Sequence, residues 1–251
     1  SDWFSQVYRN YLEYLSKTGN IENIHSIVNE EKDLHLLLNT IYRAGAVEND
    51  TIVEYIVLKG LYDGYFSSEF KESAILEMLD TLRNTTGIKE HRLTAENILT
   101  KVTRLKTGNK PPGFTLPAFD STLVSLDDLK GKFVYLNFCT SLSFPCLSQF
   151  NLIKPIYEKY REVLHVVTVS VDEDNSRFMN LIRTNGYTWI FLDARDQPDI
   201  INLYDIHAFP TYFLIGPDGR LVLSPAPEPG ADFERYFSDV LRSRNVLNPH
   251  P

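Results

Sequence analysis

The stretch that decides the fold runs from Lys132 to Cys146 and reads KFVYLNFCTSLSFPC. Its first half, up to Phe138, is a β-branched and aromatic run of the kind found in buried strands. A short loop follows. Pro145 suits the first turn of a helix, because its missing N–H would have no partner there. The stretch therefore predicts a strand, a short loop and a helix that opens at Pro145 and Cys146.

The residues after this stretch continue the same alternation. Strands are predicted over 132–138, 165–171, 189–192, 211–215 and 220–223, and helices over 145–162, 175–185, 198–204 and 232–242. Alternating strands and helices are typical of an α/β sheet with helices on both faces. Because the turn Gly216-Pro217-Asp218-Gly219 joins the last two strands as a hairpin, the predicted sheet is mixed.

The residues before it have helical spacing and almost no strand alternation. Apolar side chains recur on one helical face in five segments, at 3–15, 34–41, 52–61, 75–82 and 93–105. Thr107 to Pro112 reads TGNKPP and ends the last helix, because neither Pro can continue it. We therefore expect an all-α helical domain over residues 1–108 and an α/β domain over 109–251.

Composition narrows the class of protein. The 251 residues include 43% apolar residues and carry a net charge of −8, which excludes a disordered chain and disfavours nucleic acid as a partner. No apolar run reaches the roughly 18 residues needed to cross a membrane. Two cysteines can form at most one disulfide, so a fold of this length must depend on its hydrophobic core and not on disulfides. The chain begins Ser1-Asp2-Trp3 without Met or an apolar leader, so we expect a processed or trimmed form.

Cys146 is the first candidate for chemistry. In the first turn of a helix, unpaired N–H groups and the helix dipole favour a thiolate. Far along the chain, Phe209-Pro210-Thr211 begins a strand, and Pro210 is a candidate cis peptide that would lay a backbone edge beside another site. The sequence thus predicts a reactive thiol and a segment able to receive a substrate.

Several motifs in order resemble one family. They are Pro112 to Pro117 (PGFTLP), Val124 to Lys132 (VSLDDLKGK), Val134 to Phe138 (VYLNF), and Phe209 to Thr211 followed by Phe213 to Ile215 and Asp218-Gly219. Together they resemble the thioredoxin superfamily, in particular the bacterial envelope thiol–disulfide oxidoreductases of the TlpA/ResA type and the related redoxin or alkyl-hydroperoxide-reductase branch. The resemblance implies a thioredoxin-like fold, no cofactor, and a location in the periplasm or cell envelope. The implied partners are protein thiols or disulfides, or an extended peptide segment.

The active-site loop departs from the family pattern, which is usually Trp-Ala-x-Trp-Cys-x-Pro-Cys. Here the loop reads CTSLSFPC, with Cys139 and Leu142 in place of the two tryptophans and Ser143 in place of the first cysteine. In the family that cysteine attacks a substrate disulfide and the second one resolves the mixed disulfide. Because a serine hydroxyl cannot do this, we expect weak, single-thiol or absent redox activity.

Three interpretations of the loop stay open. In the first, Cys146 and Ser143 are the catalytic residues, and Cys146 either acts as a lone thiol or forms a disulfide with Cys139. The substrate then binds against Phe144, Pro145, Phe209 and Pro210. In the second, the domain is a non-catalytic peptide- or protein-binding redoxin module. In the third, Ser143-Phe144-Pro145-Cys146 resembles the Ser-x-x-Cys part of a peroxiredoxin loop, with Arg177, Arg183 and Arg195 as candidates to activate the thiolate.

Other polar residues indicate no further chemistry. The six His have no metal-ligand spacing, and we predict no metal site. Asp172 to Asn175 is interpreted as a strand-to-helix turn with an N-cap. The sequence has no glycine-rich phosphate loop and no Gly-x-Ser-x-Gly elbow. Any chemistry of this chain is therefore expected to be sulfur chemistry.

Overall fold

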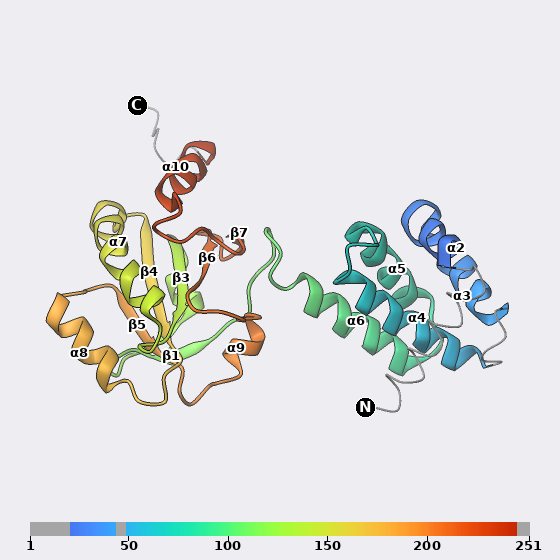
Figure 1. The fold of residues 1–251 in the computed structure, drawn as a ribbon, viewed down its shortest axis with the longest axis horizontal. Helices are drawn as coiled ribbons and strands as arrows, with labels where there is room; N and C mark the ends of the chain where they lie inside the picture. The colour runs from blue at the N-terminus through green and yellow to red at the C-terminus, as the bar shows by residue number, and fades with distance from the viewer. Residues whose placement is uncertain (1–20, 44–48, 245–251) are drawn as a thin grey trace. The chain divides into compact units, whose positions relative to one another are not determined.

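The computed structural model describes residues 21–43 and 49–244, and the chain divides into two compact units between Thr103 and Arg104. The first unit is helical, and the second contains the mixed sheet (Figure 1). The predicted apolar segment at 3–15 lies outside the described residues. Within the described ranges, no helix combines the length and apolar character needed to cross a bilayer.

Within residues 21–43 and 49–103, the helical unit has six helical elements, whose helices Figure 1 labels. They are α2 (Ile21–Ser26), the π-helical turn η1 (Ile27–Glu31), α3 (Leu34–Arg43), α4 (Asp50–Tyr65), α5 (Glu72–Thr85) and α6 (Lys89–Thr103). The segments at 34–41, 52–61 and 75–82 lie within α3, α4 and α5, as predicted. The sequence pattern missed the turn η1, whose Ile27 and Val28 are buried in the same core.

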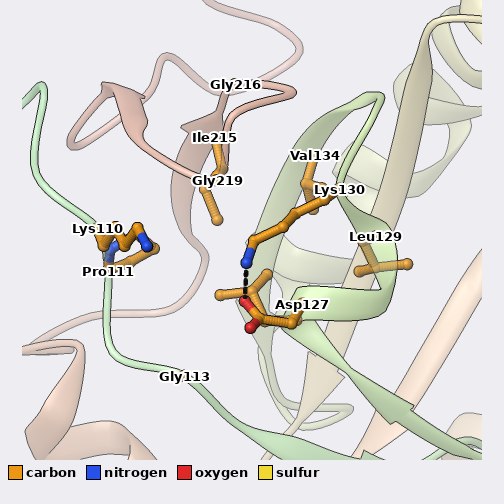
Figure 2. A pocket seen from close by; sticks show the side chains of 11 residues that line it. Lys110, Pro111, Gly113, Asp127, Leu129, Lys130, Val134, Ile215, Gly216 and Gly219 are labelled. Atoms are coloured by element: carbon orange, nitrogen blue, oxygen red, sulfur yellow. Dashed lines mark ion pairs between the residues drawn. The ribbon is translucent and has the colours of Figure 1, made fainter.

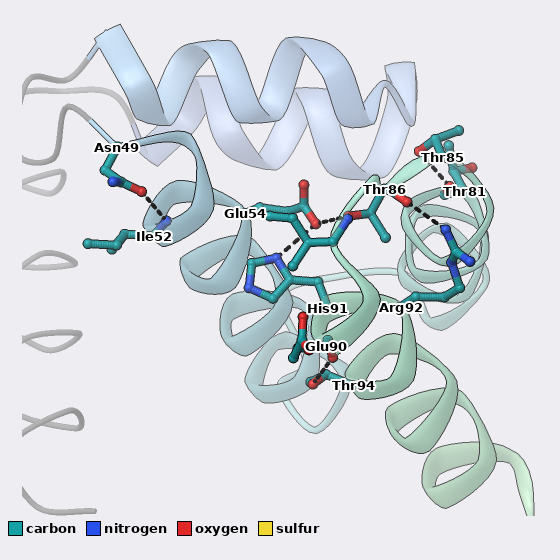
Figure 3. Close-up of polar contacts among 11 residues, drawn as sticks. Asn49, Ile52, Glu54, Thr81, Thr85, Thr86, Glu90, His91, Arg92 and Thr94 are labelled. Carbon is teal, nitrogen blue, oxygen red and sulfur yellow. Dashed lines mark hydrogen bonds and ion pairs between the residues drawn. The ribbon is translucent and has the colours of Figure 1, made fainter.

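One face of α6 differs from the predicted apolar stripe. Leu93 is exposed, whereas His91 and Ala95, one turn apart, point into the core. The buried imidazole is accommodated because its Nδ1 lies 2.9 Å from Oε1 of Glu54, which also accepts a hydrogen bond from the Thr86 hydroxyl (Figure 3). A polar triad therefore replaces an apolar contact at this position of the bundle.

The α/β unit is built on a five-stranded sheet in the order β5-β4-β3-β6-β7. The strands are β3 (Phe133–Cys139), β4 (Leu164–Ser170), β5 (Ile190–Asp193), β6 (Thr211–Ile215) and β7 (Leu221–Leu223). β3 pairs parallel with β4 and antiparallel with β6, so the sheet is mixed, as predicted. The helices are α7 (Phe144–Tyr160), α8 (Ser176–Asn185), α9 (Ile200–Leu203) and α10 (Phe233–Ser243).

The bounds of these strands and helices differ from the predicted ones by no more than two residues. Ahead of them, the structure adds elements that the sequence pattern did not predict. A small antiparallel hairpin joins β1 (Thr115–Pro117) to β2 (Leu123–Ser125), and the 3-10 turn η2 (Leu126–Leu129) leads into β3. These segments are too short to establish a recognisable period in the sequence.

Strand β3 is buried on both faces, which explains why all of its side chains except that of Asn137 are apolar. Phe133 and Tyr135 face a core that includes side chains of α7, α8 and α10. Val134 and Leu136 face a second core that includes α9 and the β1 segment. Because β3 is the central strand, its carboxyl end lies in the middle of the sheet, and the loop that follows is held between two packed cores.

Candidate functional site

The loop between β3 and α7 is fixed by the residue that begins the helix. Ser143 is the N-cap of α7, and its hydroxyl oxygen accepts a hydrogen bond from the Cys146 N–H at 3.4 Å. Pro145 occupies the first helical turn, where no backbone donor is needed. The Ser143 N–H donates to the Thr140 carbonyl at 3.2 Å, so the four-residue turn brings the end of β3 next to the start of α7.

The same serine connects the loop to the start of β6. The Ser143 hydroxyl lies 3.3 Å from the Phe209 carbonyl and donates to it. The Phe209–Pro210 peptide bond is cis. The structure thus brings together the predicted site residues Ser143, Phe209 and Pro210, although they are far apart in the sequence.

Both cysteines are free and fully buried in the same core. Burial raises the pKa of the Cys139 thiol well above its usual range, and its hydrogen bond to Cys146 raises it further. The pKa of Cys146 is lowered, chiefly by its interaction with the Cys139 thiol, with smaller contributions from Thr140 and Ser143. The candidate pair is therefore asymmetric, and Cys146 is the better thiolate.

Asp172 is a site residue that the sequence interpretation missed. Instead of serving the following helix, whose N-cap is Asn175, its carboxylate accepts from the Thr140 hydroxyl and from the Ser141 N–H at 2.9 Å. Asp172 follows β4, and the ends of parallel β3 and β4 meet at one edge of the sheet. The expected meeting of these two strand ends is the signal in the sequence that could have identified Asp172 as a site residue. The carboxylate clamps the loop, and its charge raises the pKa of both cysteines.

Tyr212 of β6 is a second residue that sequence reasoning missed. Its side chain is buried in the core that contains both cysteines, and its hydroxyl has no hydrogen-bond partner within the described part of the chain. Burial raises the pKa of this phenol well above the usual range, and the charges of Cys139 and Cys146 raise it further. Its ring stacks on Tyr135, whose own hydroxyl donates to the Pro227 carbonyl at 2.7 Å.

The outer surface of the loop is apolar. The side chains of Leu142 and Phe144, on either side of Ser143, are 79% and 80% exposed. Pro145 is exposed as well, and Phe209 and Pro210 are half-buried. The predicted substrate-binding residues therefore lie at the surface, while the two sulfur atoms lie beneath it.

Cavities in the described part of the α/β unit lie both beside the loop and away from it. One, of about 270 Å³, lies beside the loop and is lined by Ser141 and Leu147 together with Arg177, Asn180 and other residues of α8. The other, of about 210 Å³, is lined by Lys110, Val134, Ile215 and their neighbours (Figure 2). Val134 and Ile215 pair at the end of β3 away from Cys139, so this second cavity is separate from the loop.

The three candidate arginines are in different settings. Arg177 lines the cavity beside Ser141, whereas Arg195 pairs with Asp193 of β5. Arg183 lies in the last turn of α8. Over residues 21–43 and 49–244, no three His, Cys, Asp or Glu side chains cluster in a way that could hold a metal ion. The arrangement offers thiol chemistry and hydrogen-bond donors at the loop.

Comparisons with known proteins agree with this fold. A family profile described as thioredoxin-like matches residues 131–221. The chain is 31% identical over 120 residues to the thiol–disulfide oxidoreductase ResA of Bacillus subtilis, which covers 47% of this chain and 66% of that protein. It is 30% identical over 149 residues to ResA of Geobacillus kaustophilus, which covers 57% of this chain and 83% of that protein.

Solved structures give the same fold. A protein from Chlorobium tepidum, described as a DsbE-like thiol:disulfide interchange protein, is 27% identical with a TM-score of 0.50, over 55% of this chain and 97% of that one. A thioredoxin-like protein from Bacteroides caccae is 19% identical with a TM-score of 0.50, over 82% of this chain and 76% of that one. The second likeness shows the fold alone.

Proposed function

The chain belongs to the thioredoxin superfamily, on its TlpA/ResA-like branch, and we propose that it is a member with weak, single-thiol or absent redox turnover. The observation that supports this most directly is the place of Ser143. Its hydroxyl caps α7 and donates to Phe209, where the family has its attacking sulfur. Below it, Cys146 has 0% exposure. A disulfide of another protein therefore contacts the Ser143 hydroxyl at the surface, because neither cysteine sulfur is exposed.

The proposed partners follow from the surface of the loop. Leu142 and Phe144 present apolar side chains on either side of Ser143, and the Phe209-Pro210 backbone lies beside it. This arrangement fits an extended peptide segment, including one that carries a thiol or disulfide. The similarity to ResA and DsbE-type proteins supports a proposed location in the periplasm or cell envelope.

The first test is the reduction of insulin disulfides by dithiothreitol. We expect the wild-type protein to accelerate the reaction no more than background, because no exposed thiol is available to begin the exchange. Brisk turnover by the wild type would overturn the proposal and would mean that another thiol replaces the missing one.

A matched pair of variants tests the loop geometry. Ser143→Cys restores two cysteines at the family spacing and should form a reducible disulfide with Cys146, with a gain in insulin reduction. Ser148→Cys adds a thiol to the same helix at an exposed position away from the N-cap and should give neither effect. Equal behaviour of the two variants would contradict the assignment of Ser143 to the exchange position.

A second candidate function is supported by the same exposed side chains, namely peptide binding without redox chemistry. Binding of the reduced insulin B chain, measured by calorimetry, should survive Cys146→Ala and weaken in a Leu142→Ala, Phe144→Ala double variant. Loss of binding in Cys146→Ala, with the fold intact by circular dichroism, would instead favour a thiol-dependent mechanism.

A further inference from the structure

Beneath the serine lies a second arrangement that the family pattern does not describe. Cys139 is the last residue of β3, and Cys146 is in the first turn of α7. Both are free, both are fully buried, and the turn from Thr140 to Ser143 holds the two segments side by side. The Tyr212 hydroxyl, which has no partner among the described residues, belongs to the same core.

We propose that Cys139, Cys146 and Tyr212 form a buried dithiol site that reduces one small hydroperoxide molecule and closes into a disulfide joining β3 to α7. The inference rests on the proposed function in one respect, which is that Cys146 retains thiol chemistry without Cys-x-x-Cys exchange. The inference adds Cys139 as the resolving thiol, Tyr212 as a hydrogen-bond donor and a small hydroperoxide as the oxidant.

The burial of both cysteine sulfur atoms limits the size of the oxidant that can reach them. Each cysteine has 0% exposure, so the disulfide of another protein cannot approach either sulfur in the folded state. A molecule the size of hydrogen peroxide needs only a local opening at the start of α7. Polar groups are also available to receive it, since the Ser143 hydroxyl accepts from the Cys146 N–H and the unpartnered Tyr212 hydroxyl belongs to the core that holds both cysteines, among the described residues.

The roles of the two thiols follow from their asymmetry. The Cys146 thiolate attacks one peroxide oxygen; the S–O bond forms, the O–O bond breaks, and the departing hydroxide takes up the proton that Cys146 released, giving water. The Cys139 sulfur then attacks the sulfenic sulfur of Cys146. The S–S bond forms, the S–O bond breaks, and the thiol proton of Cys139 leaves with the hydroxide as a second water. Two thiols are oxidised and one hydroperoxide is reduced.

Tyr212 is the donor for the oxygen that develops negative charge. Its raised pKa keeps the phenol protonated, so that it donates a hydrogen bond and does not compete as an anion. An unpartnered buried hydroxyl is costly to maintain. A peroxide or sulfenate oxygen between Tyr212 and Cys146 gives that hydroxyl a partner.

The test uses the full chain and hydrogen peroxide. After exposure, free thiols are blocked with iodoacetamide in denaturant, and chymotrypsin is used to cleave after Leu142, between the two cysteines. We expect the two peptides to remain joined, with the loss of two hydrogen atoms, and to separate after reduction. Two alkylated peptides, or sulfinic acid at Cys146 with no linkage, would overturn the proposal.

Variants of Cys139, Cys146 and Tyr212 distinguish the roles of the three residues in the reaction with peroxide. In Cys139→Ala, oxidation should stop at a sulfenic acid on Cys146 that dimedone traps, and in Cys146→Ala, Cys139 should stay reduced. Tyr212→Phe should slow disulfide formation about tenfold, the effect of losing one hydrogen bond to a charged oxygen. The matched control Tyr135→Phe loses a buried hydroxyl that is already bonded to Pro227 and should oxidise at the wild-type rate. Equal rates for both tyrosine variants would remove Tyr212 from the site.

The outcomes also separate this inference from the proposed function. Brisk insulin reduction would overturn the weak-turnover proposal, whatever peroxide does to the buried pair. Failure of the peroxide reaction, with insulin turnover at background, would overturn only the dithiol site.

Discussion

Cys139, at the carboxyl end of β3, and Cys146, in the first turn of α7, are buried in one core and shift each other's pKa in opposite directions. Their interaction lowers the pKa of Cys146 and raises that of Cys139, because it stabilises a thiolate on Cys146 and a thiol on Cys139. Two cysteines that the sequence places seven positions apart therefore have different chemistry, although both are equally buried.

The first prediction concerns the pH at which Cys146 ionises. Its lowered pKa means that the thiolate forms at a lower pH than for an ordinary thiol, which ionises near roughly 8.5. Cys139→Ala removes the largest cause of the lowering and should move the midpoint upward, whereas Ser143→Ala removes a smaller cause and should move it less. Ultraviolet thiolate absorbance against pH measures both.

The control for this titration is Cys146→Ala, which leaves only Cys139. Because burial raises the pKa of Cys139, this variant should show no thiolate step at or below the ordinary value. Identical midpoints in the wild type and Cys139→Ala would show that the contact between the thiols does not affect ionisation.

The second prediction concerns Asp172. Asp172→Asn removes a charge that raises the pKa of Cys146, so the Cys146 midpoint should fall. The loop also loses a charged acceptor of the Thr140 hydroxyl and the Ser141 N–H, and the free energy of unfolding should drop by about 1–3 kcal/mol. Glu173→Gln, at an exposed neighbouring position, serves as the control for both measurements. A midpoint that rises in Asp172→Asn would contradict the assignment.

The third prediction concerns the packing under α7. Phe150 is fully buried and contacts the rings of Phe178, Tyr187, Trp189 and Phe191. Phe150→Ala should lower the free energy of unfolding by about 3–5 kcal/mol, through lost burial and the cavity that remains. Urea unfolding followed by Trp189 fluorescence, in a Trp3→Phe background, measures the loss.

The matched control for that packing is Phe144→Ala, at the exposed start of the same helix. Phe144 is 80% exposed, so its removal should change the unfolding free energy far less than the removal of Phe150. A comparable loss in the two variants would mean that Phe144 is part of the core and not of the surface of the loop.

The fourth prediction concerns the polar triad of the helical unit (Figure 3). Glu54→Ala removes the acceptor of both His91 and Thr86, leaving two buried polar groups without it. The free energy of unfolding should fall by about 1–3 kcal/mol for each group left unpaired. Thermal unfolding followed by circular dichroism measures this, and Glu96→Ala on the exposed face of α6 is the control. An equal loss in the control would contradict the assignment of the effect to the buried triad, because Ala favours a helix more than Glu does.

Local chemistry in the sequence was enough to predict most of the α/β unit. The β-branched and aromatic run over 132–138 indicated a strand, and Pro145 indicated a helix start, because both signals depend only on neighbouring residues. The short β1–β2 hairpin was not predicted, since three-residue strands carry too little pattern. His91 took a core position that spacing had assigned to Leu93, because Glu54, on another helix, supplies the partner of the imidazole.

The sequence by itself determined which side chain stands at the exchange position, since Ser143 is fixed by its spacing from Cys146 and from the strand before it. Only the tertiary structure decided what surrounds that position. Asp172, Phe209 and Tyr212 reach the loop because the parallel pairing of β3 with β4 and the antiparallel pairing of β3 with β6 bring distant segments to one edge of the sheet. Strand pairing is a long-range property that spacing along the chain does not encode.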